Sequence, residues 1–175
     1  GLVVAYGLTE ASPVVTQTGL DDAPEVRLGT IGRSIAGAEV RAIDPATGSV
    51  VPDGTAGELV TRGPMVMRGY FEMPDETNAA IDREGWLHTG DLAVRDGRGI
   101  WSIVGRLKDM IIRGGENIYP AEIEAVGRRL PGVSDMQVVG VPSDYFGEEV
   151  FAWVQASPGS TVTEDGLRAS LGEHL

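Results

Sequence analysis

The chain has 175 residues, and its 26 acidic side chains against 14 basic ones give a formal net charge of −12 at pH 7. This charge argues against nucleic-acid binding, because neutralising phosphates requires a basic surface. Hydrophobic residues make up 42% and charged residues 23% of the chain, as in folded proteins and unlike disordered ones. The 25 glycines and 10 prolines indicate many turns and short strands.

No cysteine is present, so disulfides, zinc–thiolate sites and thiol catalysis are excluded. A histidine-rich metal site is not expected either, because His88 and His174 are the only histidines. No apolar run approaches the roughly 18 residues of a membrane span, and no basic segment precedes an apolar leader. We therefore expect a soluble, cytoplasmic protein without a transmembrane segment. Lys108 is the only lysine beside thirteen arginines, so a lysine-dependent step can be checked at one position.

The two ends of the chain resemble cut ends. The apolar run Leu2–Ala5, closed by Gly7, predicts a buried strand at the edge of a large sheet. Leucines at every fourth position of residues 167–175, behind the candidate N-cap Thr163, predict an amphipathic helix. Because that strand has no neighbours here and that helix has no C-terminal cap, we expect a fragment of a larger protein.

The middle of the chain alternates short strands with turn residues between Ile31 and Tyr70. This spacing is typical of a small β-meander or barrel. In chain order, the expected elements are strands at Glu39–Ile43 and Glu58–Thr61, a helix at Pro74–Ile81, and a hairpin of Leu92–Arg95 and Ile100–Val104.

After Arg106 the pattern becomes that of a compact α+β unit. The predicted helix Pro120–Leu130 has proline in its first turn, acids near its start and arginines near its end. The other expected elements are a strand at Asp109–Arg113, a turn at Gly114–Gly115, and strands at Met136–Val141 and Val150–Gln155.

The expected fold is a mixed α/β fragment with a boundary in the charged stretch Arg106–Asp109. Residues 1–106 would hold the edge strand of a large-domain sheet and a small β-rich subdomain. Residues 107–175 would form a small, mobile, truncated α+β domain.

Two stretches carry residues suited to binding a nucleotide. In the first, the Tyr6 ring offers a face to a base, the Thr9 hydroxyl can donate to a phosphate, and the Glu10 carboxylate can hold Mg²⁺. In the second, Asp91 can accept hydrogen bonds from a ribose diol. Taken in isolation, the first stretch is better explained as a helix cap with an exposed acid, and the second as a hairpin-capping aspartate.

Two further clusters also have a plainer structural interpretation, which is the more common one in isolation. Arg106 and Lys108 suit either a binding role or plain solvation at a domain edge. The segment Gly114–Asn117 can form a phosphate-cradling nest or a simple turn after a strand.

The order of six motifs along the chain decides between these alternatives. They resemble the adenylate-forming superfamily, specifically acyl-CoA synthetases and most closely the medium-chain fatty acyl-CoA synthetases. The resemblance covers residues 1 to about 155 almost continuously. The motifs are Tyr6–Glu10, Gly29–Arg33, Gly57–Leu59, Gly69–Phe71, Gly85–Asp91 and Gly105–Glu124.

The resemblance implies an ATP-dependent acid–thiol ligase that uses Mg²⁺ and coenzyme A. A carboxylic acid, preferably a medium-to-long fatty acid, would attack the α-phosphate of ATP, and the thiol of CoA would then displace AMP. The implied roles are adenine stacking by Tyr6 beside Gly7, α-phosphate binding by Thr9, Mg²⁺ binding by Glu10, and ribose binding by Asp91 and Arg106.

The resemblance also implies moving parts in the last third of the chain. Lys108 matches the hinge about which the small domain of these enzymes rotates between the two half-reactions. The loop made of Arg113, Gly114, Gly115, Glu116 and Asn117 would line the channel for the pantetheine arm of CoA.

Two parts that the resemblance calls for have no match here, namely a glycine-rich phosphate loop and an adenylation lysine near the end of the small domain. We therefore expect these 175 residues alone to be inactive. Two alternatives stay open: an adenylation domain that loads a carrier protein, and a non-catalytic binding module.

Overall fold

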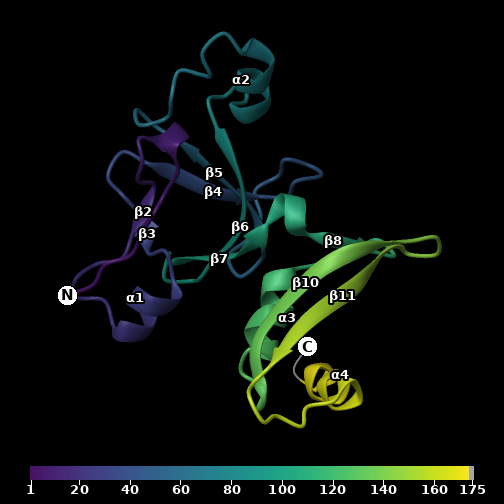
Figure 1. The fold of residues 1–175 in the computed structure, drawn as a ribbon. Coiled ribbons are helices and arrows are strands. Elements are labelled where there is room, and N and C mark those ends of the chain that lie inside the picture. The colour runs from purple at the N-terminus through teal and green to yellow at the C-terminus, as the bar shows by residue number, and fades with distance from the viewer. Residues whose placement is uncertain (174–175) are drawn as a thin grey trace. The chain divides into compact units, whose positions relative to one another are not determined.

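A computed structural model describes residues 1–173, which fall into two compact units, Gly1–Val104 and a second unit that begins at Gly105 (Figure 1). The fold is mixed α/β, with antiparallel sheets and few helices, as the sequence predicted. Two residues at the end of the leucine-periodic segment, His174 and Leu175, lie outside the described residues. Within residues 1–173, no helix combines the length and apolarity needed to cross a bilayer.

The first unit begins with a small antiparallel sheet in the order β1-β2-β3. The prediction of a buried strand over Leu2–Ala5 is wrong: Leu2 is 59% exposed and the strand starts only at Ala5. Val4 instead exchanges hydrogen bonds with Thr18: its N–H donates to the Thr18 hydroxyl oxygen at 2.9 Å, and its carbonyl accepts from the Thr18 N–H at 2.9 Å. The elements of this region are β1 (Ala5–Tyr6), the 3₁₀ turn η1 (Thr9–Ala11), β2 (Thr16–Gln17), helix α1 (Pro24–Gly29) and β3 (Arg33–Ser34).

A four-stranded sheet with consecutive neighbours, in the order β4-β5-β6-β7, forms the rest of the first unit, although the last two residues of β7 are counted with the second unit. The meander predicted between Ile31 and Tyr70 supplies only β4 and β5, and the separately predicted hairpin, with both strands longer than expected, supplies β6 and β7. Ala42, Leu59, Ala93 and Trp101 form one buried cluster of the unit. The elements are β4 (Glu39–Ile43), β5 (Gly57–Arg62), helix α2 (Pro74–Ala80), β6 (Leu87–Arg95) and β7 (Trp101–Arg106).

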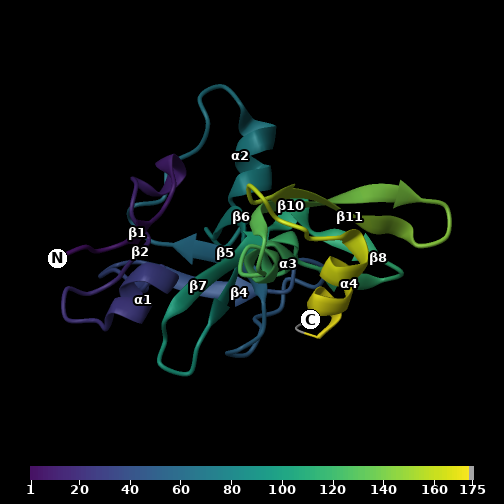
Figure 2. The same ribbon diagram turned by 60° about the horizontal axis from the view of Figure 1, so that its bottom comes forward.

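The second unit packs two helices on one sheet, in the strand order β10-β11-β8-β9. A long hairpin, β10 with β11, dominates it in both views (Figures 1 and 2). Its core contains Ile111, Met136 and Val138, against which side chains of both helices pack. The elements are the 3₁₀ turn η2 (Leu107–Asp109), β8 (Ile111–Arg113), β9 (Glu116–Ile118), helix α3 (Pro120–Gly127), β10 (Val133–Ser143), β11 (Gly147–Ala156) and helix α4 (Glu164–Gly172).

The helix ends of the second unit follow local chemistry. Helix α3 starts at Pro120 as predicted but ends at Gly127, because tighter i to i+3 bonds carry the chain on to Leu130. Helix α4 begins behind its predicted N-cap, and the Thr163 hydroxyl accepts a hydrogen bond from the N–H of Gly166 at 3.3 Å.

Candidate functional site

Two predicted nucleotide-binding residues that lie 85 positions apart in the sequence meet in the first unit. The Tyr6 hydroxyl, on β1, donates a hydrogen bond to Oδ2 of Asp91, on β6, at 2.7 Å. Both residues are half-buried. Tyr6 also packs against the buried cluster formed by Ala11, Val15 and Leu87. The ring and the carboxylate are therefore held in a fixed mutual orientation.

The segment after β1 turns sharply because of Gly7. A Cβ atom at this position would overlap the carbonyl oxygen of Pro13, so only glycine fits. The turn leads into η1, where Thr9 is exposed and Glu10 is half-buried.

Glu10 is anchored by a residue that sequence reasoning assigned no role. The Tyr70 hydroxyl donates to Oε1 of Glu10 at 2.9 Å, and this bond to a carboxylate is the main reason why the pKa of Tyr70 is raised. The backbone carbonyl of Glu10 also accepts from the N–H of Met67 at 2.8 Å. The position of Tyr70 in the motif Gly69–Phe71 was the only signal for it.

The carboxylate of Glu10 fits a magnesium ion that arrives with a nucleotide. Mg²⁺ is usually bound by one or two carboxylates together with substrate phosphates and water. Within residues 1–173 there is no group of three or more histidine, aspartate or glutamate side chains able to hold a metal. The single carboxylate of Glu10 therefore suits a metal ion whose other ligands come from a substrate.

Asp91 lies on an irregular part of β6. Glu58 of β5 pairs with Leu92, and Val60 pairs with His88, so the register shifts between them. Three residues of β6, at positions 89–91, thus face one residue of β5. This is a β-bulge, a device that re-aims side chains near functional sites.

Arg106 and Lys108 belong to the second unit, whereas the other predicted nucleotide-binding residues belong to the first. Arg106 is the exposed last residue of β7. Lys108 is exposed in η2, a single turn between β7 and β8. A short exposed turn between two strands can change its backbone angles without unpacking a core.

The predicted channel loop forms a tight hairpin turn between β8 and β9. Gly114 and Gly115 have φ angles of 61° and 90°, as a two-residue turn of type I′ requires. Arg113 ends β8, and Glu116 and Asn117 begin β9.

Arg113 fixes this turn to the tip of the β10–β11 hairpin. Its Nε and Nη2 donate to the Glu149 carboxylate at 2.8 and 3.3 Å, and its guanidinium lies 4.0 Å from the centroid of the Phe146 ring. The N–H of Gly114 donates to the carbonyl oxygen of Phe146 at 2.9 Å. No sequence motif pointed to Phe146 or Glu149.

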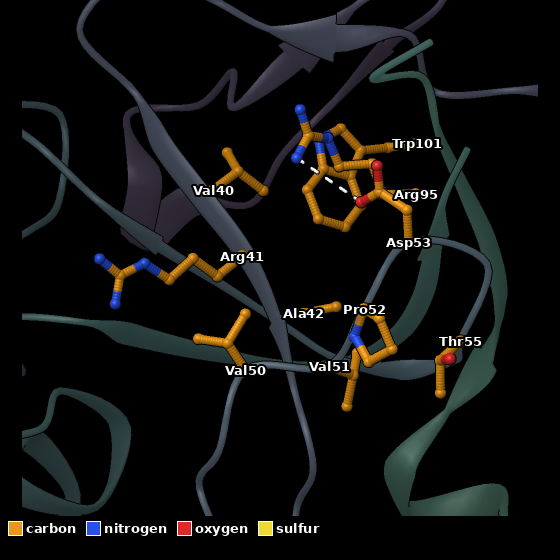
Figure 3. A pocket seen from close by; sticks show the side chains of 10 residues that line it. All are labelled: Val40, Arg41, Ala42, Val50, Val51, Pro52, Asp53, Thr55, Arg95 and Trp101. Atoms are coloured by element: carbon orange, nitrogen blue, oxygen red, sulfur yellow. Dashed lines mark ion pairs between the residues drawn. The ribbon is translucent and has the colours of Figure 1, made fainter. Parts of the chain in front are cut away.

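A surface hollow beside β4 contains none of the predicted residues (Figure 3). Val40, Val51 and Trp101 line it, and Arg95 and Asp53 form an ion pair across 3.6 Å at its rim. Its volume is about 70 Å³, whereas ligand pockets typically reach roughly 300 Å³ or more. It is therefore too small to be the candidate site.

Comparison with known proteins finds relatives that are named as acyl-CoA synthetases and ligases. A sequence profile of AMP-binding enzymes matches residues 1–71. The chain is 52% identical over 168 residues to YngI of Bacillus subtilis, provisionally named an acyl-CoA synthetase. It is 44% identical over 168 residues to ACSF2 of Bos taurus, a mitochondrial medium-chain acyl-CoA ligase.

These alignments cover 96% of this chain but 31% of YngI and 27% of ACSF2. The chain thus spans less than a third of the length of these relatives. Among solved structures, the ATP-bound crystal structure of MatB from Rhodopseudomonas palustris matches with a TM-score of 0.91 and 38% identity. That match covers 99% of this chain and 34% of MatB.

Proposed function

Because the chain belongs to the adenylate-forming superfamily, as a C-terminal portion of such an enzyme, we propose that its parent protein is an ATP-dependent acid–thiol ligase. It activates a fatty acid as acyl-AMP and transfers the acyl group to CoA. The observation that carries the proposal is the hydrogen bond between Tyr6 and Asp91. It joins two motifs, far apart in sequence, that suit the base and the ribose of one nucleotide.

In the first half-reaction, an oxygen of the substrate carboxylate attacks the α-phosphorus of ATP, and the bond to pyrophosphate breaks. Tyr6 stacks on adenine, and Asp91 and Arg106 hold the ribose hydroxyls. Thr9 donates to an α-phosphate oxygen, and Glu10 binds Mg²⁺, which neutralises phosphate charge. Positioning and charge neutralisation supply most of the catalysis in phosphoryl chemistry.

In the second half-reaction, the thiol of CoA attacks the acyl carbonyl and AMP leaves. Lys108 lies at the pivot of the small domain, and the loop Arg113–Asn117 lines the pantetheine channel. Two features support these roles: the exposure of Lys108 in a single turn, and the glycine pair that leaves backbone surface uncovered.

The acid is a medium-to-long-chain fatty acid, a choice supported by the medium-chain ligase among the relatives. The proposed compartment is the cytoplasm. The 175 residues alone do not form an acyl-adenylate, because their only lysine lies at the proposed pivot.

The ribose assignment is tested by Asp91→Ala in the full-length parent enzyme. A hydrogen bond to a charged group contributes about 1.5–3 kcal/mol, so ATP should bind about 10- to 150-fold more weakly in calorimetry. Carboxylate-dependent pyrophosphate exchange should lose affinity for ATP to the same extent. The matched control is Asp53→Ala at the rim of the small hollow. Equal ATP affinity of the Asp91 variant and the wild type would refute the assignment.

The hinge assignment is tested by Lys108→Pro, which restricts the pivot backbone. Adenylation, followed by pyrophosphate exchange, should stay within about twofold of wild type, whereas thioester formation with CoA should fall at least about tenfold. Lys108→Ala serves as the control for loss of the charge alone. Equal loss of both half-reactions in the proline variant would contradict the assignment. If the wild-type enzyme transfers the acyl group only to a carrier protein, that protein replaces CoA as the proposed acceptor.

A further inference from the structure

A buried carboxylate without a role in the proposed chemistry lies beside Asp91. The side chain of Glu58, on β5, is only 6% exposed. A buried carboxylate is costly unless hydrogen bonds satisfy it. Its Oε1 accepts from the N–H of Gly90 at 3.1 Å, and its Oε2 lies 2.9 Å from Nδ1 of His88. The two carboxylate oxygens thus contact the two residues of β6 on either side of Thr89, and the second of them, Gly90, directly precedes Asp91.

These contacts satisfy the backbone of the bulge. An interrupted strand pairing leaves amide and carbonyl groups without strand partners, and such groups need others when buried. Thr89 supplies two more contacts: its hydroxyl donates to the carbonyl of buried Leu59 at 2.6 Å and accepts from the N–H of Asp91 at 3.1 Å. Gly90 has a φ of 71°, which a residue with a Cβ rarely adopts.

We propose that Glu58 is a positioning residue for Asp91. Together with the Thr89 hydroxyl, its carboxylate holds the bulge in one conformation, so that the Asp91 carboxylate meets the Tyr6 hydroxyl and the ribose in a single orientation. This inference rests on the proposed role of Asp91 in nucleotide binding. Glu58 acts through the backbone of β6 and through His88.

The inference predicts a specific kinetic signature. Ribose contacts are made equally in the ground state and the transition state, so losing their alignment raises KM without lowering kcat. Glu58→Ala in the full-length enzyme should raise the KM for ATP about tenfold, the equivalent of one charged hydrogen bond. Glu58→Gln, whose amide oxygen still accepts from Gly90, should stay within about threefold of wild type. Glu39→Ala, at an exposed glutamate of β4, is the control.

A double-mutant cycle separates positioning from general stability. If Glu58 acts through Asp91, then Glu58→Ala adds no further loss of ATP affinity in an Asp91→Ala background. Additive losses, or a fall in kcat as large as the rise in KM, would overturn the inference. If Glu58→Ala does not fold, Thr89→Val is used instead, because it removes the Thr89 hydroxyl that also holds the bulge. Thr89→Ser keeps that hydroxyl and should behave like wild type in the same measurements of KM and ATP affinity.

Hydrogen exchange gives a readout that does not depend on nucleotide binding. The Gly90 amide should exchange at least about tenfold faster in Glu58→Ala than in wild type, with the Glu39→Ala control unchanged. Unchanged exchange overturns the inference. If Asp91→Ala leaves ATP binding intact while Gly90 exchange accelerates in Glu58→Ala, the bracing of the bulge stands and the proposed function of Asp91 fails.

Discussion

Two strand pairings, β5 with β6 and β10 with β11, satisfy their backbone hydrogen-bonding groups in different ways. The β10–β11 ladder runs from Asp135 to Ser143 without interruption, its only register shift lying at the start of β10. The β5–β6 ladder is broken in its middle by the bulge at 89–91. In the first case strand hydrogen bonds satisfy the backbone, and side chains are left to pack. In the second, Glu58 and Thr89 satisfy the backbone, and Asp91 is left to meet Tyr6.

The difference indicates where function can be built into a sheet. A regular ladder fixes alternate side chains on two faces, whereas a bulge re-aims one side chain at the expense of backbone partners. The β10–β11 pairing should therefore respond to mutation through stability, and the β5–β6 pairing through ligand affinity. Three substitutions test this contrast.

The largest expected effect is that of Met136→Ala in the regular hairpin. Met136 is 1% exposed in the core of the second unit, and truncating a buried methionine costs about 2–5 kcal/mol. Chemical denaturation should show this loss in the unfolding of the second unit, while the ATP affinity of the parent enzyme stays unchanged. A loss of ATP affinity as large as that of Asp91→Ala would contradict the contrast.

An intermediate effect is expected from alanine at two glycines with similar backbone angles. Gly90 in the bulge and Gly147 in the β10–β11 hairpin have φ angles of 71° and 80°, and neither position crowds a Cβ atom. Each change should cost about 1–2 kcal/mol of unfolding free energy through backbone strain. Only Gly90→Ala should also weaken ATP binding, because only Gly90 adjoins Asp91. Equal ATP affinities of the two variants would remove the functional distinction.

The smallest effect is expected from Tyr70→Phe, which removes the hydroxyl bonded to Glu10. Tyr70 is 38% exposed, so solvent weakens this bond to a carboxylate below the about 1.5–3 kcal/mol of a buried charged hydrogen bond. The Mg²⁺ concentration for half-maximal adenylation should therefore rise only about two- to tenfold. Tyr145→Phe, at a tyrosine of the second unit that is 86% exposed, is the control. An unchanged magnesium requirement would separate Tyr70 from the metal site.

Local chemistry predicted several elements closely. The strand Glu39–Ile43, the start of α3 at Pro120 and the Thr163 cap depend on short-range patterns, and the structure contains all three. The helix α1 was not predicted, because its six residues follow Asp21 and Asp22 in a stretch that resembles a loop. A helix of that length has almost no periodicity to detect.

The arrangement of the candidate site was beyond local patterns. The motifs singled out Tyr6 and Asp91 separately, but nothing in their spacing predicts a 2.7 Å contact between them. The bulge that presents Asp91 depends on Glu58, some thirty residues upstream. The motif Gly57–Leu59 contains Glu58 but gave it no role, so its burial and its two partners became visible only in three dimensions.

The turn at Gly114–Gly115 is bonded to the tip of the β10–β11 hairpin, which limits how the turn can move. Arg113 is gripped by a carboxylate on one side and an aromatic ring on the other, and Gly114 is bonded to the same hairpin tip. A turn tethered in this way has little freedom to rearrange by itself. If the turn moves during thioester formation, the whole β10–β11 hairpin must move with it. Spectroscopic labels on Glu116 and Tyr145 should therefore keep a constant separation throughout the catalytic cycle.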